Sequence, residues 1–255
     1  MASFDILGNI ALVKFPEKTT AKEKKRFALE ILERQKSVST VVEKAERFKG
    51  RLRTIKTRHL AGDKTKEVLY KENGCEFRFN IETCYFSSRL SSERLEIAKQ
   101  CKKGENVLVM FGGVAPFAIV IAKHGKAERI VSVELGRECN KYAIENVKRN
   151  RIKNVEIVQG DVKKKINGKE KFERIVMARP NLKESFLPWA FKASKKGTII
   201  YYYGFYNEDD KDEMIELIDS EARKAKKKVK ILRMKRAGDI APYKYRYRCD
   251  FKVLN

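Results

Sequence analysis

Residues 107–117 read Val-Leu-Val-Met-Phe-Gly-Gly-Val-Ala-Pro-Phe, and residues 131–134 read Val-Ser-Val-Glu. The first segment predicts an apolar strand that enters a glycine turn and then a helix. The second predicts a short strand that ends on an acid. In an open parallel sheet, this order places a tight backbone turn beside a nucleotide and a carboxylate within reach of ribose hydroxyls. The pattern therefore indicates a nucleotide-cofactor site.

Two simpler interpretations compete with this one. Gly112-Gly113 lacks the third glycine of a dinucleotide fingerprint, so the glycines alone also fit an ordinary turn between a strand and a helix. The uncharged run 107–122 is shorter than the roughly 18 apolar residues that a membrane span needs, and Pro116 interrupts it. The sequence contains no Gly-x-x-x-x-Gly-Lys loop, which disfavours an ATPase.

The bulk composition points to a polyanionic partner. The chain of 255 residues has a formal net charge of +24, from 58 Lys and Arg against 34 Asp and Glu, which favours nucleic acid over a membrane. The first residues contain no signal sequence or basic anchor, so we expect a cytoplasmic protein. The five cysteines are scattered and the two histidines lie far apart. We therefore expect no metal site and no disulfide framework, with the cysteines as small core residues.

The first 84 residues are predicted to form a small α+β module. Residues 4–15 and 67–79 each contain a turn pair, Gly-Asn or Asn-Gly, between apolar runs, and each range reads as two short strands. Residues 38–42 read as a further strand. Residues 21–35 read as an amphipathic helix with lysines and arginines on its outer face.

Residues 85–255 are predicted to form a second domain in which strands and helices alternate. Such alternation argues for an α/β fold with a doubly wound, Rossmann-like sheet, and we expect a final antiparallel strand at its edge. The predicted elements are 95–101, 107–110, 116–124, 129–134, 138–150, 155–159, 174–177, 186–193, 198–203, 210–226, 228–234 and 245–253.

Two acids follow successive predicted strands of this domain. Glu134 can accept hydrogen bonds from a ribose diol, and Asp161 can meet an adenine amino group, although either acid alone also fits a helix cap. Together they describe an adenosine pocket. The order of features resembles that of S-adenosylmethionine-dependent methyltransferases of the Rossmann-like class. The residues that we expect to bind this cofactor are Phe111, Gly113, Val114, Pro116, Glu134, Asp161 and Val162.

A more specific resemblance rests mainly on segments other than the glycine turn. The most specific of them is Tyr85-Phe-Ser-Ser-Arg-Leu-Ser-Ser-Glu-Arg94. The others are 72–75, 111–117, 177–180, 186–187, 200–203, 241–242 and 249–251. Together they resemble the archaeal and eukaryotic Trm5 family over nearly the whole chain. That family comprises tRNA guanine-37 N1-methyltransferases and is related to the enzymes of the wybutosine pathway.

The resemblance assigns catalytic roles. N1 of guanine carries a proton whose loss pushes negative charge onto O6, so a base and a nearby cation are needed. The resemblance implies that Glu93 is the base, that Arg53 is the cation at O6, and that Tyr85 helps to hold the target base. It also implies that Arg89 and Arg94 position phosphates or the base. Without the resemblance, Glu93 and Arg94 read as an ion pair at a helix start, and Arg53 reads as a surface arginine.

The sequence departs from the family's pattern at three places. Val109 stands where the first motif usually has an acid, and Ala115 replaces a later glycine. The catalytic loop, usually Asn-Leu-Pro, reads Ala178-Arg179-Pro180. Pro180 remains, and we expect Arg179 to offer donors to the substrate. The missing asparagine affects base specificity more than methyl transfer, because the sulfonium supplies its own electrophile.

The resemblance also implies the partner. We expect a short form without the family's separate N-terminal domain, acting as a monomer on the anticodon stem-loop of tRNA. The basic first module then supplies much of the phosphate affinity, so binding should depend strongly on salt. The base at position 37 must be splayed out of the loop to reach the cofactor.

Three alternatives remain at this stage. The altered loop leaves room for C7 methylation of 4-demethylwyosine at the same position, additionally or instead. An aminocarboxypropyl transferase of the wybutosine pathway uses the same cofactor but transfers a different carbon. A non-catalytic tRNA-binding protein with a relic pocket is the third, for which Val109 and Ala178 are the evidence.

Overall fold

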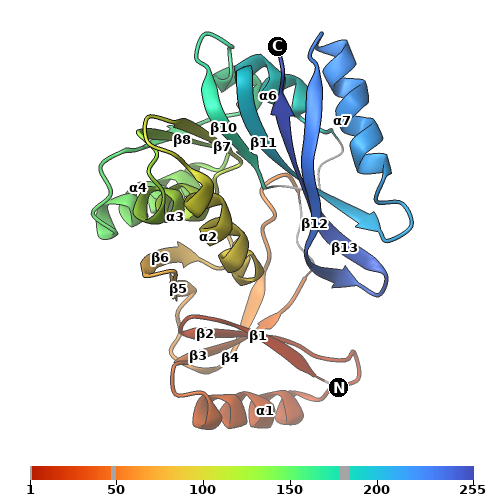
Figure 1. The fold of residues 1–255 in the computed structure, drawn as a ribbon. Helices are drawn as coiled ribbons and strands as arrows, with labels where there is room; N and C mark the ends of the chain where they lie inside the picture. Colours follow the sequence, from red (N-terminus) through yellow and green to blue (C-terminus); the bar gives the residue numbers. More distant parts are fainter. Residues whose placement is uncertain (1, 47–49, 179–183) are drawn as a thin grey trace.

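The structure is a computed structural model that describes residues 2–46, 50–178 and 184–255. Its strands form a four-stranded sheet, a two-stranded hairpin and a seven-stranded sheet. The chain begins in the small sheet and ends in the large one (Figure 1). This α/β architecture agrees with the fold class that the sequence predicts.

The small sheet has the order β1-β2-β3-β4, with β2 and β3 parallel. Helix α1 lies on the side of this sheet that faces away from the large domain (Figure 1). Thr20 begins the helix with a capping box, in which its hydroxyl accepts from the Glu23 amide at 3.3 Å. Strand β4 was not predicted from the sequence. The elements are β1 (Ser3–Leu7), β2 (Ile10–Lys14), α1 (Ala21–Arg34), β3 (Thr40–Lys44) and β4 (Thr57–Gly62).

The hairpin of β5 (Glu67–Glu72) and β6 (Cys75–Asn80) connects the two sheets. On one side, Asn9 in the β1–β2 turn donates to the Glu67 carbonyl at 3.1 Å and accepts from the Leu69 amide at 2.7 Å. On the other side, Asn146 pairs with both backbone groups of Arg78, at 2.8 and 3.0 Å, as a neighbouring strand would. The hairpin therefore contacts both parts of the molecule, and the domain boundary at residue 84 stays a prediction.

The large sheet has the order β12-β13-β11-β10-β7-β8-β9. The five strands from β11 to β9 are parallel, whereas β13 is antiparallel to both of its neighbours. The strands are β7 (Asn106–Met110), β8 (Arg129–Glu134), β9 (Val155–Gln159), β10 (Phe172–Met177), β11 (Ser194–Asn207), β12 (Val229–Ala241) and β13 (Lys244–Val253).

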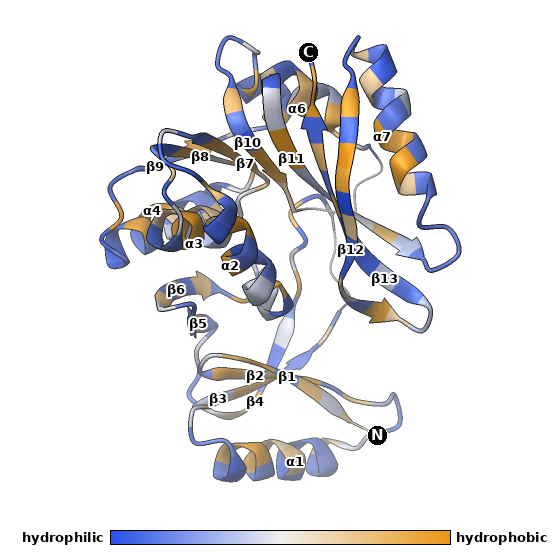
Figure 2. Ribbon diagram, in the orientation of Figure 1, coloured by the Kyte–Doolittle hydropathy of each residue, from blue (hydrophilic) through white to orange (hydrophobic). Residues whose placement is uncertain are grey.

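The prediction that the last strand forms the edge of the sheet was wrong. Strand β13 lies between β11 and β12, and β12 is the edge. Figure 2 shows that β13 is largely hydrophilic, unlike β7 and β8. Its residues Arg246, Arg248 and Asp250 are nevertheless buried. In the sequence alone, a strand with several charged residues is typical of the exposed edge of a sheet. The structure buries these residues, and Arg248 pairs with Asp250 and with other charged side chains.

Helices cover both faces of the large sheet. The helices α2, α3 and α4 pack against one face, where the core includes Val107, Val109 and Ile130. The helices α5, α6 and α7 pack against the other, where the core includes Leu108, Met110 and Val131. This alternation along β7 follows from the period of two in a strand. The helices are α2 (Ser91–Gln100), which follows a short 3₁₀ helix (Ser88–Leu90), α3 (Pro116–His124), α4 (Arg137–Arg149), α5 (Val162–Lys165), α6 (Leu187–Ala193) and α7 (Glu213–Lys224).

Candidate active site

The glycine turn connects β7 to α3, as the sequence predicts. Phe111, Gly113 and Ala115 all have positive φ, at 62°, 56° and 66°, so the chain reverses within five residues. A Cβ atom on Gly112 would lie 2.1 Å from the Ser132 hydroxyl on β8. Glycine is therefore required at 112 by close packing. Ala115 adopts a conformation that favours glycine.

Glu134 lies at the end of β8, directly beside this turn. Its carboxylate accepts hydrogen bonds from the Gly113 amide at 2.9 Å and from the Gly136 amide at 2.7 Å. The amide of Asn140 holds the Glu134 carbonyl at 2.8 Å. Each carboxylate oxygen has one backbone donor and keeps further acceptor capacity. The structure thus places an oriented carboxylate where the sequence predicts a ribose contact.

Asp161 begins α5 at the end of β9. Its side chain accepts from the Lys163 amide at 3.0 Å and from Arg51 at 2.9 Å. Partial burial raises the pKa of the Asp161 carboxyl, but the hydrogen bonds from Arg51 and Lys163 outweigh burial and hold the pKa below its usual value. Asp161 therefore is an anion at neutral pH, and Arg51 is its partner in this structure.

A small cavity of about 70 Å³ lies between the glycine turn and residues 51–53. Its lining comprises Arg51, Leu52, Arg53, Tyr85, Phe111, Gly113, Glu134, Cys139 and Ala178. The glycine turn, the carboxylate and the Phe111 ring fit the adenosine part of S-adenosylmethionine. Ligand pockets usually measure roughly 300 Å³ or more, so this cavity is smaller than the whole cofactor needs. Val114, Pro116 and Val162 do not line this cavity.

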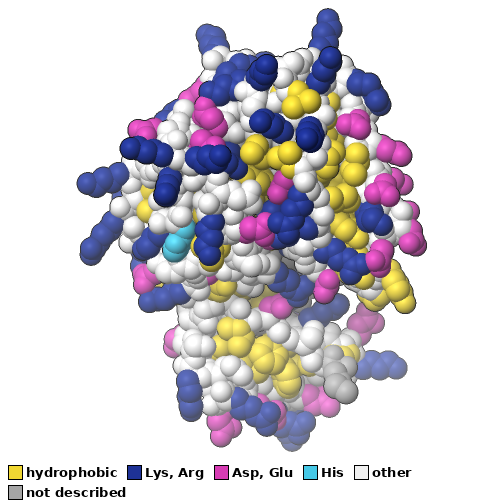
Figure 3. Space-filling model, viewed as in Figure 1, with side chains coloured by type: hydrophobic (Ala, Val, Ile, Leu, Met, Phe, Trp, Pro, Cys, Tyr) yellow, Lys and Arg dark blue, Asp and Glu magenta, His cyan; other side chains and the backbone are white. Residues whose placement is uncertain are grey.

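A larger cleft of about 660 Å³ opens between the small sheet and the large domain. Its lining includes the cations Lys14, Lys44, Arg53, Arg89, Lys244 and Arg246. Among the described residues, Asp5 is its single carboxylate, and it pairs with Arg89 at 3.5 Å. Figure 3 shows Lys and Arg side chains at the waist between the two parts of the molecule. This charge suits a polyanion.

Arg53 and Tyr85 line both the cavity and the cleft. The Arg53 guanidinium lies 3.6 Å from the centre of the Tyr85 ring, in a cation–π contact. Arg53 has φ of 54°, in the left-handed region that few residues other than glycine adopt. The structure thus brings two predicted catalytic residues together at the point where the two openings meet.

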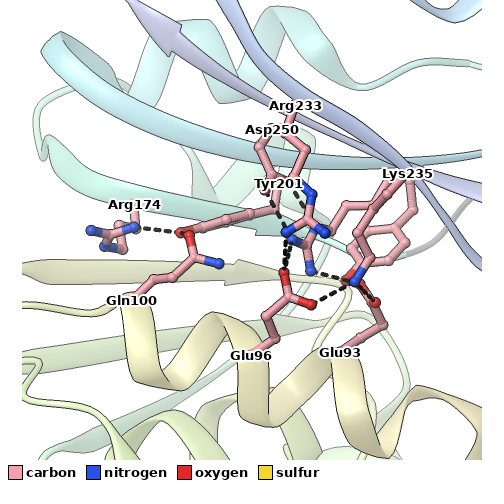
Figure 4. Close-up of polar contacts among 10 residues, drawn as sticks. Glu93, Glu96, Gln100, Arg174, Tyr201, Arg233, Lys235 and Asp250 are labelled. Atoms are coloured by element: carbon pink, nitrogen blue, oxygen red, sulfur yellow. Dashed lines mark hydrogen bonds and ion pairs between the residues drawn. The ribbon is translucent and has the colours of Figure 1, made fainter.

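Glu93 lies in a buried network of charges between α2 and the sheet (Figure 4). One oxygen, Oε2, accepts from Arg248 at 2.7 Å and from the Tyr203 hydroxyl at 3.0 Å. The other, Oε1, lies 2.6 Å from the Lys235 ammonium. Glu93 lines neither the cavity nor the cleft. The ion pair between Glu93 and Arg94 that the simpler interpretation gives is not formed, because Arg94 pairs with Glu72 and Glu93 with Arg248.

Glu96 and Asp250 complete this network. Arg248 donates to Glu96 at 2.5 Å and to Asp250 at 2.7 Å, and Lys235 lies 2.5 Å from Glu96. Burial raises the pKa of Glu96, but the hydrogen bonds from Lys235 and Arg248 outweigh burial and lower it to about 2. Burial lowers the pKa of Arg248, but Asp250 and Glu93 raise it above its usual value. Glu96 and Arg248 therefore stay ionised at neutral pH, whereas burial raises the pKa of the Asp250 carboxyl above its usual value.

Arg94 lies near the start of α2. Its guanidinium is buried and forms two hydrogen bonds with Glu72, one of them at 2.6 Å, and a third with the Ser87 carbonyl at 3.0 Å. It also lies against the rings of Phe86 and Phe117. These contacts tie Arg94 to the loop before α2, and its role in positioning the substrate stays a prediction.

The remaining predicted residues fall at the edge of what the structure describes. Arg89 lines the cleft, and Ala178 lines the small cavity. Arg179 and Pro180 lie outside the described residues. Ala178, the last described residue before this gap, lines the cavity together with Arg53 and Tyr85.

The sequence analysis missed the residues that surround Glu93, namely Tyr203, Lys235, Arg248 and Asp250. It also missed Arg246, which lines the cleft. A signal for three of them exists in β13, where Arg246, Arg248 and Asp250 recur at every second position and therefore share one face of a strand.

Two observations concern membranes and metals. No helix in the described ranges is long and apolar enough to cross a bilayer. Within the same ranges, no three His, Cys, Asp or Glu side chains are grouped so that they could hold a metal ion. The five cysteines are free and buried, as expected of core residues.

Comparison with known proteins shows matches along the whole chain. A sequence model of the TRM5/TYW2 methyltransferase domain matches residues 68–232, and one of the TYW2 N-terminal domain matches residues 1–65. The chain is 36% identical to a tRNA (guanine(37)-N(1))-methyltransferase, Trm5b of Pyrococcus abyssi, over 98% of the chain and 74% of that protein. It is 30% identical to Taw22 of Nanoarchaeum equitans, a tRNA (guanine(37)-N(1))/4-demethylwyosine(37)-methyltransferase, over 99% of the chain and 100% of that protein.

Solved structures of related proteins also superpose on almost all of this chain. The crystal structure of Pyrococcus abyssi Trm5b superposes with a TM-score of 0.89 at 35% identity, covering 99% of this chain and 75% of the other. A complex of aTrm5 with tRNALeu superposes with a TM-score of 0.88 at 26% identity, covering 99% of this chain and 72% of the other. The match extends over both the small sheet and the large domain.

Proposed function

The chain belongs to the TRM5/TYW2 methyltransferase family, and from that premise we propose that it transfers a methyl group from S-adenosylmethionine to position 37 of tRNA. The acceptor is N1 of guanosine and, in the wyosine pathway, C7 of 4-demethylwyosine. One observation carries the proposal: Arg53 and Tyr85 border both a cavity with an adenosine-type carboxylate and a basic cleft. A base splayed from an RNA strand in the cleft reaches the donor at that border.

Glu134, the glycine turn and Phe111 hold the cofactor, whose sulfonium supplies an electrophilic methyl group. Tyr85 offers a flat aromatic face to the target base, and Arg53 stacks on that ring. As the N1 proton leaves, negative charge develops on O6, and the Arg53 guanidinium stabilises it. These residues therefore provide alignment and electrostatic stabilisation.

Glu93 receives the N1 proton in this proposal. Its Oε2 atom is held by Arg248 and Tyr203, whereas Oε1 faces Lys235, whose side chain is 20% exposed. Oε1 is therefore the oxygen that a substrate proton approaches, once Lys235 moves aside. Because Glu93 lines neither opening, the bound RNA must reach toward α2.

Methyl transfer is favoured over the alternatives. Three relatives with 30% identity or more over two thirds of the chain carry methyltransferase names, and two of them, Taw22 and Taw21 of Saccharolobus solfataricus, are named for 4-demethylwyosine. Transfer of an aminocarboxypropyl group and a purely RNA-binding role are not favoured by these names. A methyl acceptor at position 37 is common to all three relatives.

The basic cleft supports tRNA as the substrate. A related structure contains tRNALeu. Neutralised phosphates release counterions, so affinity for tRNA should fall steeply as salt rises. A monomer, cytoplasmic residence and contacts from Arg179 and Pro180 remain predictions.

The test is a methylation assay with defined RNA. The purified protein is incubated with S-adenosylmethionine and tRNA carrying guanosine, 4-demethylwyosine or, as a control, adenosine at position 37. Mass analysis of the nucleosides should show one added methyl on at least one of the first two and none on adenosine. An aminocarboxypropyl adduct, or tRNA binding without methylation of either nucleoside, would contradict the proposal.

A further inference from the structure

Arg246 is a buried cation for which the described part of the chain shows no ion pair with a carboxylate. It lies on β13 opposite Phe205 of β11, lines the basic cleft and is 5% exposed. Among the residues that the structure describes, no group accepts a hydrogen bond from its Nε or Nη1 atom. Its guanidinium lies 5.6 Å from the centre of the Phe205 ring. That contact alone does not replace a hydrogen-bonding anion.

Arg248, two residues further along β13, is an arginine whose hydrogen bonds are accepted by carboxylates. Residues at i and i+2 of a strand point to the same face. Arg248 is fully buried, and Glu93, Glu96 and Asp250 accept its hydrogen bonds. Within residues 2–46, 50–178 and 184–255, the fold thus surrounds Arg248 with carboxylates but places no carboxylate in an ion pair with Arg246.

The surroundings of Arg246 increase its need for negative charge. Burial lowers the pKa of the Arg246 guanidinium, and the positive charges of Arg53 and Arg89 lower it further, while Tyr85 and Tyr203 act in the opposite direction. Asp5, the carboxylate of the cleft, pairs with Arg89. A buried charge that lacks a partner is costly, so the arrangement is favourable only when an anion enters the cleft.

We propose that Arg246 binds a backbone phosphate of the RNA strand next to the nucleotide that is methylated. This inference rests on the proposed function, because it takes the cleft as the RNA site. A phosphate fits better than a base edge because it carries a full negative charge, whereas O6 of guanine is a neutral acceptor before the reaction. Arginine–phosphate hydrogen bonds are charge-assisted and about twice as strong as neutral ones. The role of Arg246 is to place the strand, while Arg53 and Tyr85 contact the base.

Salt-dependent binding of an anticodon stem-loop RNA tests the assignment. Arg246→Met removes the charge and keeps an unbranched apolar side chain, and Arg246→Lys keeps a point charge. Arg129→Met is the matched control, because Arg129 lies at the start of β8, pairs with Glu156 and Glu170, and lines neither the cavity nor the cleft. We expect Arg246→Met to weaken binding about tenfold and to reduce the slope of log K against log salt by about 1, as for one lost phosphate contact. Arg246→Lys should recover part of both losses.

Neutral linkages in the RNA identify the phosphate. Each phosphate flanking position 37 is replaced in turn by a methylphosphonate, and binding to the wild type and to Arg246→Met is compared. At one linkage, the replacement should weaken binding to the wild type but not to the variant. The inference is overturned if Arg246→Met matches Arg129→Met in affinity and slope, or if every linkage weakens both proteins equally.

The outcomes separate this inference from the proposed function. A wild-type protein that methylates position 37 but binds RNA independently of Arg246 overturns the inference alone. A protein that binds the stem-loop through Arg246 but methylates no nucleoside supports the phosphate site and overturns the proposed function. Binding of S-adenosylmethionine, measured by calorimetry, should be equal in the wild type and both Arg246 variants.

Discussion

Two neighbouring regions of the protein handle charge in opposite ways. Between α2 and the sheet, cations and carboxylates are balanced: Arg233, Lys235 and Arg248 face Glu93, Glu96 and Asp250. In the cleft, six Lys and Arg side chains line the surface with Asp5 as the single described carboxylate. The first region is neutralised by the fold itself. The second carries an excess of positive charge that suits a polyanion.

The largest expected effect tests whether Glu93 is more than a member of the balanced network. Glu93→Gln should lower single-turnover methylation of guanosine at least about 100-fold, because a general base contributes roughly 10² to 10⁴. Binding of S-adenosylmethionine should be nearly unchanged. Glu96→Gln is the matched control, since Glu96 contacts the same Arg248 and Lys235. Equal activity of the two variants would remove Glu93 as the base.

The second prediction compares the two arginines of β13 directly. Arg248→Met leaves three carboxylates without their buried cation and should reduce the free energy of unfolding by about 3–5 kcal/mol. Arg246→Met removes an unpartnered charge and should change the free energy of unfolding by less than about 1 kcal/mol, or raise it. Urea denaturation measures both. Similar losses of unfolding free energy in both variants would show that Arg246 has a stabilising partner in the fold, which would contradict the difference between the two arginines.

The third prediction concerns the cofactor cavity, where close packing of the backbone, and not charge, restricts which residue can stand at position 112. Gly112→Ala places a Cβ atom 2.1 Å from the Ser132 hydroxyl. We expect a loss of about 1–3 kcal/mol in unfolding free energy from overpacking, together with weaker binding of S-adenosylmethionine. Ser132→Ala removes the clashing oxygen, because the Ser132 Cβ lies at 3.4 Å from the same point. The double variant should therefore recover most of both losses, and an absence of recovery would refute this explanation.

The smallest expected effect is a pH dependence within the network. The folded-state pKa of Glu96 is about 2, below its usual 4.5. Its contribution to stability is therefore full above pH 4.5 and is lost as the pH falls toward 2. Because the side chain is partly exposed, we expect this contribution to be about 1 kcal/mol. The difference in stability between the wild type and Glu96→Gln should shrink over this range, and a constant difference would contradict the assignment.

The parts of the site that follow from local sequence were predictable. The turn after β7 needs glycine at 112 and 113 for packing and for φ, and the acid after β8 lies directly beside it. These features depend on neighbours in one strand and on the period of two in a sheet. The excess of 24 positive charges likewise predicted a polyanion partner without any coordinates.

The partners of the charged residues were not predictable in this way. Glu93 meets Tyr203 and Arg248 from 110 and 155 residues away, and Arg94 pairs with Glu72 instead of with Glu93. Strand β13 enters the sheet beside β11, which buries charges that look exposed in the sequence. Only this long-range pairing distinguishes the satisfied Arg248 from the unsatisfied Arg246.

The sequence by itself determined the cofactor turn, the α/β alternation and the basic character, because periodicity, backbone conformation and total charge are local or additive properties. The tertiary structure decided which charges neutralise one another and which remain for a ligand. That distinction depends on burial and on strand order, which bring together residues that are distant along the chain. Two arginines on the same strand therefore have different roles: Arg248 stabilises the fold, and Arg246, as we propose, binds RNA.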